Sequence, residues 1–211
     1  MLIFGDAELC ALGPPETRQP LIAVAVIEGN LEAVSRTSRS STGRATMRRD
    51  TVSTRAEALA SRVEQGVQAL AAYAEGLSDR EWRTVCDDGR TVGVLVHHVA
   101  SQLICETEVL KQMATGKAFS GVSWAMVDEG NAAHARDHAG RSQQEAAELL
   151  RRNGALAAEA IRALRDEQLD LATPNSLHAD APVTTQFWIE THPLAHAYHH
   201  LASIRTALSA Q

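Results

Sequence analysis

The amino-acid sequence predicts an all-α protein built as a four-helix bundle. Aromatic residues make up only 4% of the 211 residues while alanine is abundant, a balance that favours closely packed helices over strands. Apolar residues recur at three- and four-residue spacing in four long segments, and helix-capping residues precede several of them. Four long helices that each carry an apolar stripe can bury those stripes by packing against one another in a bundle.

The expected elements follow from these stripes and caps. The long helices are expected at about residues 54–76, 91–115, 142–164 and 184–208, with an extra short helix from about Ser123, between helices two and three. Ser78 and Ser142 each precede a glutamate by three residues, which is the spacing of a capping box, so a helical turn should follow each of them. Residues 170–182 contain Pro174, Asn175 and Pro182 and are expected to form a loop.

Two positions disturb the regular helical pattern. Pro193 lies inside the fourth helix, where a proline removes one backbone hydrogen bond and kinks the helix. In the second helix, Gln102 and Glu106 fall inside the apolar stripe. Burying a polar side chain costs free energy unless it has a partner. A metal site inside the bundle would provide that partner.

Residues 53–211 are expected to form the bundle, and residues 1–52 differ from them in character. The tract 35–46 is rich in arginine and serine, has no helical period and offers nothing to bury. We therefore expect residues 1–52 to be disordered, or to be a mis-called extension whose natural start is Met47. A regulatory or targeting tail is the alternative.

Composition excludes several classes of function. The formal net charge of −6 and the lack of a basic face argue against nucleic acid as a partner. No apolar run reaches the roughly 18–20 residues of a membrane span, and Asp6 and Glu8 stand where a secretory signal carries positive charge. Three widely spaced cysteines suit a reducing compartment. We expect a cytoplasmic protein that acts on a small molecule, and the sequence leaves homodimer formation open.

The segment 191–204 packs four histidines into nine residues. His196 and His200 are four residues apart, so on a helix their imidazoles lie one turn apart on the same face, at the flank of the apolar stripe. His192 and His199 point further away from that stripe. Two imidazoles on one rigid element favour a first-row divalent metal, which binds neutral imidazole nitrogen at about 2.0–2.1 Å.

A third ligand is expected from the second helix. His98 falls on the flank of the apolar stripe there, whereas its neighbour His97 points nearly away from it. Three protein ligands leave a fourth position for water or substrate, as in catalytic zinc sites. Glu106 lies about two turns from His98, so we expect Glu106 and Gln102 to contact the substrate or to support the metal ligands from behind.

His134 and His138 form another pair with a spacing of four. They lie next to Arg136 and Asp137, on what the sequence indicates to be a solvated face. We therefore interpret this pair as exposed surface, with metal binding as the less favoured alternative.

Two motifs resemble a known family. Val96-His-His-Val-Ala100, followed far downstream by His196-Ala-Tyr-His-His-Leu-Ala-Ser-Ile204, resembles the DinB-like superfamily, in particular the metal-binding domain of mycothiol-dependent maleylpyruvate isomerase. The resemblance covers about residues 54–210. It implies a four-helix bundle that binds zinc, or another divalent metal such as nickel, through His98, His196 and His200. In characterised branches such a bundle activates a low-molecular-weight thiol for S-transfer or isomerisation.

Three functional hypotheses follow. The first is a transferase or isomerase-like enzyme that uses a thiol of the mycothiol or bacillithiol type, since a metal with an open position lowers the pKa of a bound thiol or water molecule. The second is a hydrolase that activates water on the metal, with Glu106 as the candidate general base. The third is a metal-binding bundle without enzymatic activity. Histidine ligands suit zinc, nickel, iron and copper alike, so the sequence leaves the metal open.

Overall fold

The computed structural model describes residues 53–210 and confirms the four-helix bundle. The expectations for residues 1–52 lie outside the described residues. The long helices are α1 (Thr54–Glu75), α3 (Val92–Met113), α5 (Gln143–Arg162) and a fourth made of α7 (Thr185–Ile189), a π-helical turn (Glu190–Leu194) and α8 (Ala195–Ser209). The short elements are α2 (Asp79–Trp82), α4 (Trp124–Asp137), α6 (Asp166–Leu169), β1 (Ala172–Asn175), a 3-10 turn (Ser176–His178) and β2 (Ala181–Thr184).

The predicted caps set the helix boundaries. The hydroxyl of Ser53 accepts a hydrogen bond from the backbone N–H of Ala56 and starts α1. Ser78 before α2 and Ser142 before α5 each form a complete capping box with the glutamate three residues later. These bonds satisfy backbone N–H groups that a helix start leaves without partners. Local sequence therefore decides where these elements begin.

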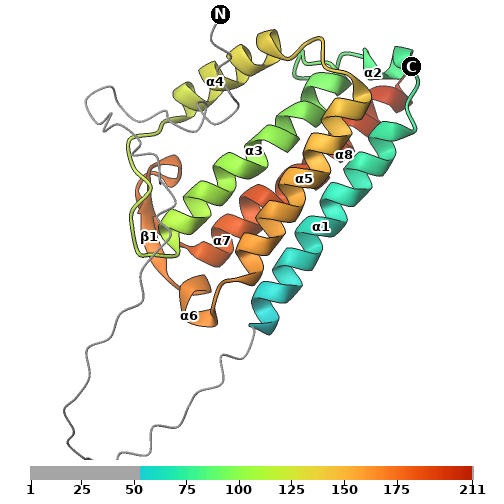
Figure 1. The fold of residues 1–211 in the computed structure, drawn as a ribbon. Helices are drawn as coiled ribbons and strands as arrows, with labels where there is room; N and C mark the ends of the chain where they lie inside the picture. Colours follow the sequence, from blue (N-terminus) through green and yellow to red (C-terminus); the bar gives the residue numbers. More distant parts are fainter. Residues whose placement is uncertain (1–52, 211) are drawn as a thin grey trace, which may run out of the picture. The chain divides into compact units, whose positions relative to one another are not determined.

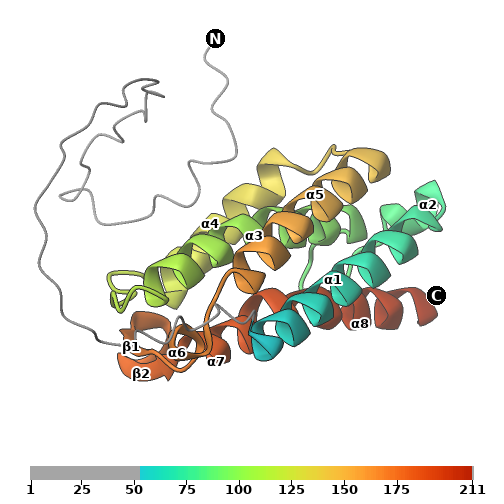
Figure 2. The ribbon, with the colours of Figure 1, turned by 60° about the horizontal axis from the view of Figure 1, so that its bottom comes forward.

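The bundle has a crossover topology (Figure 1). α1 packs against α5, α5 packs against α3, and α8 packs against both α1 and α3. α1 and α8 run in one direction while α3 and α5 run in the other, so the neighbours α3 and α5 are parallel. The chain must therefore return along the length of the bundle between them, and α4 lies on that return path. Figure 2 shows α4 outside α3, on the side away from α1.

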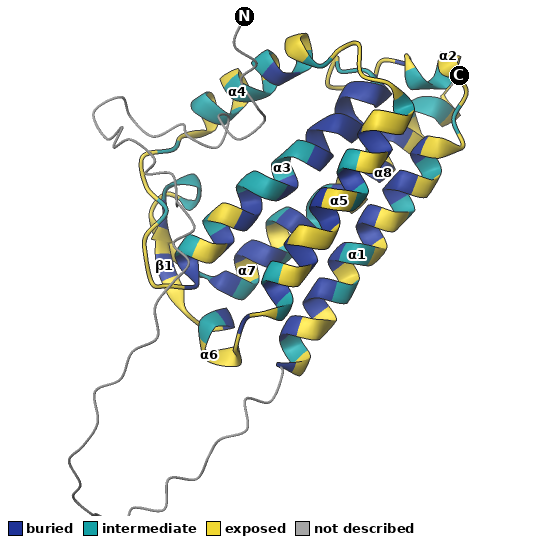
Figure 3. Cartoon of the chain, in the orientation of Figure 1, coloured by how far each residue is buried: buried dark blue, intermediate teal, exposed yellow. Residues whose placement is uncertain are grey.

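α3 is the most enclosed of the helices (Figure 3). Residues 92–100 are all buried, because α5 and α8 pack on one side of α3 and α4 lies over another. By contrast, α4 is mostly exposed or half-buried along its length. The N-terminal half of the second long helix is thus internal, while Glu108 and Lys111 nearer its C-terminus are exposed.

The structure corrects the expectation of a loop over residues 170–182. β1 and β2 pair there as an antiparallel hairpin in which Pro174 lies opposite Pro182. Prolines interrupt central strands, but both strands of an isolated hairpin are edges, where a missing N–H is tolerated. Phe119 donates its backbone N–H to the carbonyl of Pro174 at 3.0 Å, so the hairpin also holds the segment that leads into α4.

The fourth helix keeps its predicted span, and Pro193 marks its irregularity. Thr184 caps the helix through a hydrogen bond from the N–H of Phe187, and the chain stays helical to Ser209. Pro193 is buried within a π-helical turn rather than at a simple kink. Among the described helices, none combines the length and hydrophobicity needed to cross a lipid bilayer.

Two leucines of α5 test how the bundle is held together. Leu150 is fully buried and Leu156 is 49% exposed on the same helix. Leu150→Ala should lower the free energy of unfolding by about 2–5 kcal/mol, because it leaves a cavity between helices. Leu156→Ala should change it by less than about 0.5 kcal/mol. Urea denaturation followed by circular dichroism measures both, and equal losses would contradict this packing.

Candidate metal centre

Three histidines from two helices converge as predicted. His98 lies on α3, and His196 and His200 lie on α8; each offers a ligand nitrogen, and these nitrogens lie within 4.8 Å of one another. The Nε2 atoms of His98 and His196 are 3.2 Å apart. Two nitrogens bound at 2.0–2.1 Å to one tetrahedral ion lie roughly 3.4 Å apart. The arrangement therefore matches the spacing of metal ligands.

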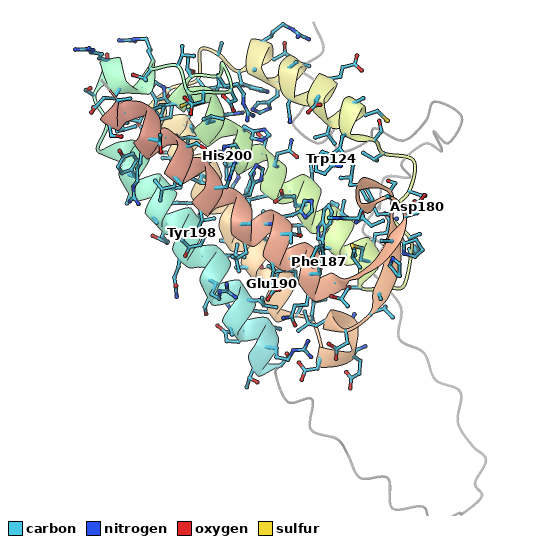
Figure 4. The ribbon with its side chains drawn as sticks, turned by 180° about the vertical axis from the view of Figure 1, so that it is seen from behind. Trp124, Asp180, Phe187, Glu190, Tyr198 and His200 are labelled. Atoms are coloured by element: carbon cyan, nitrogen blue, oxygen red, sulfur yellow. The ribbon has the colours of Figure 1, made fainter. Side chains whose placement is uncertain are left out.

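The positions of these histidines follow from the helices that carry them. Thr91 caps α3 through a hydrogen bond from the N–H of Val94, which starts the helix two turns before His98. His196 and His200 follow the π-helical turn directly. Because a π-helical turn holds one residue more than an α-helical turn, it sets the rotation of the α8 histidines about the helix axis. Figure 4 views the molecule with α8 in front and His200 labelled on it.

Burial keeps His98 and His200 neutral. Burial, followed by the nearby His196, holds the pKa of His98 far below its usual range. The same causes lower the pKa of His200 to about 3. Metal ions bind the neutral form of imidazole, so both histidines are in the ligating state at neutral pH without having to lose a proton.

Glu106 lies directly behind His196. Its Oε1 atom is 2.9 Å from Nδ1 of His196, although the two are not aligned as a hydrogen bond. A carboxylate next to the non-ligating nitrogen of a histidine is a common feature of metal sites, because it fixes the orientation and basicity of the ring. Glu106 therefore lies next to a candidate ligand and within the buried stripe of α3.

The residues present fit a divalent cation. Among the described residues, three buried polar atoms of this cluster have no hydrogen-bond partner: Nδ1 of His98, Nδ1 of His196 and Oε2 of Glu106. Buried polar atoms of a native protein are nearly always satisfied. Facing nitrogens of neutral histidines, with a carboxylate behind them, form a donor set of the kind that zinc and nickel accept.

The cluster opens into a pocket of about 980 Å³. Residues from α3, the crossover with α4, and the fourth helix line it, among them Gln102 at the position expected from the sequence. The aromatic part of its wall consists of Trp124, Phe119 and Trp188. Positive charge comes from Lys111 and Lys117. A space of this size holds a ligand of several hundred daltons next to the histidines.

Arg90 also lines this pocket, although neither the helical stripes nor the histidine motifs pointed to it. Its Nη2 atom is 2.6 Å from the carboxylate of Asp88, while its Nη1 atom is buried and has no hydrogen-bond partner among the described residues. Arg90 lies just before α3, in the segment that leads into that helix. It presents a hydrogen-bond donor with positive charge at the edge of the site.

A second histidine cluster contradicts one prediction. His134 is only 2% exposed, not part of a solvated face, and lies with His138 beside His97. His97 points toward α4, because its Nδ1 atom lies 3.1 Å from Nε2 of His134. The spacing of His134 and His138 could be seen in the sequence. The sequence could not show that this face of α4 turns toward the bundle.

Fold and site together define a class of helical-bundle proteins with a histidine cluster at an open pocket. Residues 62–204, more than half of the chain, match the family model of the DinB superfamily. The chain therefore belongs to the DinB superfamily. This confirms the resemblance seen in the two histidine motifs.

A solved structure supports the fold. YfiT from Bacillus subtilis, described as a probable metal-dependent hydrolase with an unusual four-helix bundle topology, is 20% identical to this chain with a TM-score of 0.61. The match covers 75% of this chain and 89% of YfiT. At this identity the likeness establishes the fold alone. No curated protein matches the sequence.

The low pKa of His200 predicts how the metal-free protein responds to acid. The folded-state pKa of about 3 lies below the ordinary value of 6.5, so the stability that neutral His200 contributes is complete above pH 6.5 and is lost as the pH falls toward 3. Between pH 6.5 and 5 the loss should be about 2 kcal/mol, at about 1.4 kcal/mol for each pH unit.

Denaturation of chelator-treated protein at pH 7 and pH 5 measures this loss. His200→Gln should lose less stability than the wild type on acidification, since it has no imidazole to protonate there. His199→Gln is the matched control, because His199 is exposed one residue away. A His200→Gln variant that follows the wild type at both pH values would contradict the assignment.

Proposed function

We propose that this DinB-superfamily protein is a divalent-metal-dependent enzyme that transfers the sulfur of a low-molecular-weight thiol, of the mycothiol or bacillithiol type, to a small electrophilic substrate. The observation that carries the proposal is the convergence of three histidines, two of them held neutral by burial, at a pocket of about 980 Å³. Zinc is the expected metal, with nickel as the alternative.

The metal would supply one chemical effect. A divalent cation held by His98, His196 and His200 with a position left open lowers the pKa of a thiol or water molecule bound there, so that the deprotonated form is available near neutral pH. The histidines provide neutral nitrogen donors and leave most of the positive charge of the ion uncompensated. That charge favours an anionic sulfur at the site.

Residues of this chain would handle the proton of the thiol. Oε2 of Glu106 is a buried acceptor without a hydrogen-bond partner among the described residues, and the carboxylate lines the pocket. Glu106 can therefore accept the proton, while its Oε1 atom stays next to His196. The sulfur then forms a bond to an electrophilic carbon of the second substrate, and the leaving group departs with the electron pair of the bond that breaks.

The size and lining of the pocket favour a thiol cofactor over a small nucleophile such as water alone. Low-molecular-weight thiols carry many hydroxyl, amide or carboxylate groups in addition to the sulfur. Gln102 and the buried Nη1 donor of Arg90 offer hydrogen bonds to such groups, and Lys111 and Lys117 offer charge. The aromatic residues of the wall suit the apolar part of a second substrate.

Hydrolysis of a small substrate is the second candidate. The partnerless Oε2 of Glu106 is equally suited to accept a proton from water, and YfiT is described as a probable metal-dependent hydrolase. The two candidates differ in one respect that can be measured: only the first requires a thiol.

The metal-loaded protein should therefore show thiol-dependent turnover. Protein without an affinity tag is loaded with zinc or with nickel and mixed with a chromogenic aryl halide and mycothiol, bacillithiol, glutathione or cysteine. We expect release of halide and loss of free thiol to rise above the uncatalysed rate with at least one of these thiols. Turnover of an activated ester without any thiol would instead support the hydrolase.

A pair of glutamates tests the role of the carboxylate. Glu106→Gln should lower metal affinity or activity by about 10–100-fold, because the amide replaces the negative charge behind His196 and no longer serves as a base. Glu108→Gln is the matched control, since Glu108 lines the same pocket but pairs with Lys111 at the surface. If both variants behave like the wild type in metal binding and kcat, Glu106 has neither role.

A further inference from the structure

The second histidine cluster joins two helices that otherwise share little buried surface. His97 lies on α3, His134 lies on the last turn of α4, and His138 caps the C-terminus of α4. One ligand nitrogen from each lies within 4.8 Å of the others. Nδ1 of His97 and Nε2 of His134 are 3.1 Å apart, close to the separation of two nitrogens on one tetrahedral ion.

The three rings pack directly against one another. The centroids of His97 and His138 are 4.3 Å apart, and those of His134 and His138 are 4.5 Å apart. His97 and His134 are 3% and 2% exposed. Three imidazoles that face one another in a largely buried place form a donor set that binds zinc, nickel or copper when neutral.

The way α4 packs indicates that this cluster connects α4 to the bundle. Of the residues of α4, His134 alone is fully buried, while Trp124 at its start is 55% exposed. A helix is normally held to its neighbour by an apolar stripe, and α4 offers only one buried contact residue, which is polar. The histidine cluster is thus the main buried connection between α4 and the bundle.

We propose that His97, His134 and His138 form a second divalent-metal site, which fixes α4 against α3. The ion would join a ligand of α3 to two ligands at the end of α4. Met126, Val127, Gly130 and Asn131 of α4 contribute to the wall of the pocket, so the second ion would also fix that wall. The site is independent of the chemistry proposed for the first cluster.

The two sites use separate ligands although they are neighbours. His97 and His98 are adjacent in α3, and consecutive helical residues point about 100° apart, so His97 faces α4 while His98 faces α8. The rings of His98 and His134 are 5.7 Å apart, between their centroids. Each histidine can therefore serve its own ion.

Hydrogen bonds of the cluster must give way when the second ion binds, among them the one between Nδ1 of His97 and Nε2 of His134. Nδ1 of His138 accepts a hydrogen bond from Nε of Arg141 at 3.3 Å, at the surface. Ligation through Nδ1 replaces this bond directly, and ligation through Nε2 requires a proton on Nδ1, which also ends it. The bond is long and exposed, so its loss is a small penalty compared with metal coordination.

Metal stoichiometry tests the proposal. Full-length protein without an affinity tag is stripped with a chelator, titrated with zinc chloride in a calorimeter, desalted and analysed for zinc by plasma mass spectrometry. The wild type should retain two ions per chain, while His138→Ala and His200→Ala should each retain one and the double variant none. His199→Ala, at an exposed histidine next to the first cluster, should retain two.

Each variant also reports on the second site by itself. His138 lies half-buried at a helix end, so its replacement should leave the far-ultraviolet circular dichroism spectrum unchanged. Bound zinc should slow hydrogen exchange of the α4 amides in the wild type and in His200→Ala, but not in His138→Ala. A His200→Ala variant that retains no ion, or a His138→Ala variant that retains as many ions as the wild type, would overturn the proposal whatever the fate of the first site.

Discussion

The packing of α3 against α8 is the interaction on which the candidate site depends. It buries His98 on one helix against His196 and His200 on the other. The carboxylate of Glu106 lies next to His196. Burial lowers the pKa of His98 and of His200 and keeps both imidazoles neutral. The Nε2 atoms of His98 and His196 lie 3.2 Å apart, so a cation bound between the rings would coordinate nitrogens that already face one another.

The course of the chain explains why the site is both buried and accessible. α3 and α5 are parallel neighbours, so the connection between them must run back along the bundle, and α4 lies on that path outside α3. The pocket opens along α3 between this crossover and the fourth helix. A bundle with short connections between antiparallel neighbours would have no such outer helix. The wall of the pocket is therefore a consequence of the topology.

Much of this could be predicted from sequence because it is local. Hydroxyl caps such as Ser53 and Ser142 determine helix starts, and helical spacing selects His196 and His200 from their neighbours. Long-range arrangement could not be predicted in the same way. That α4 covers His97 and buries His134 depends on the crossover, and that residues 172–184 form a hairpin depends on pairing between edge strands. Arg90 joins the pocket only through the fold.

X-ray absorption at the zinc edge identifies the atoms that hold the metal. On protein loaded with one equivalent of zinc in a His138→Ala background, we expect three imidazole nitrogens at about 2.0–2.1 Å and one further light ligand. Introducing His200→Ala into that background should remove one imidazole from the first coordination shell. A shell with sulfur, or with fewer than three imidazoles before that change, would contradict a site formed by His98, His196 and His200.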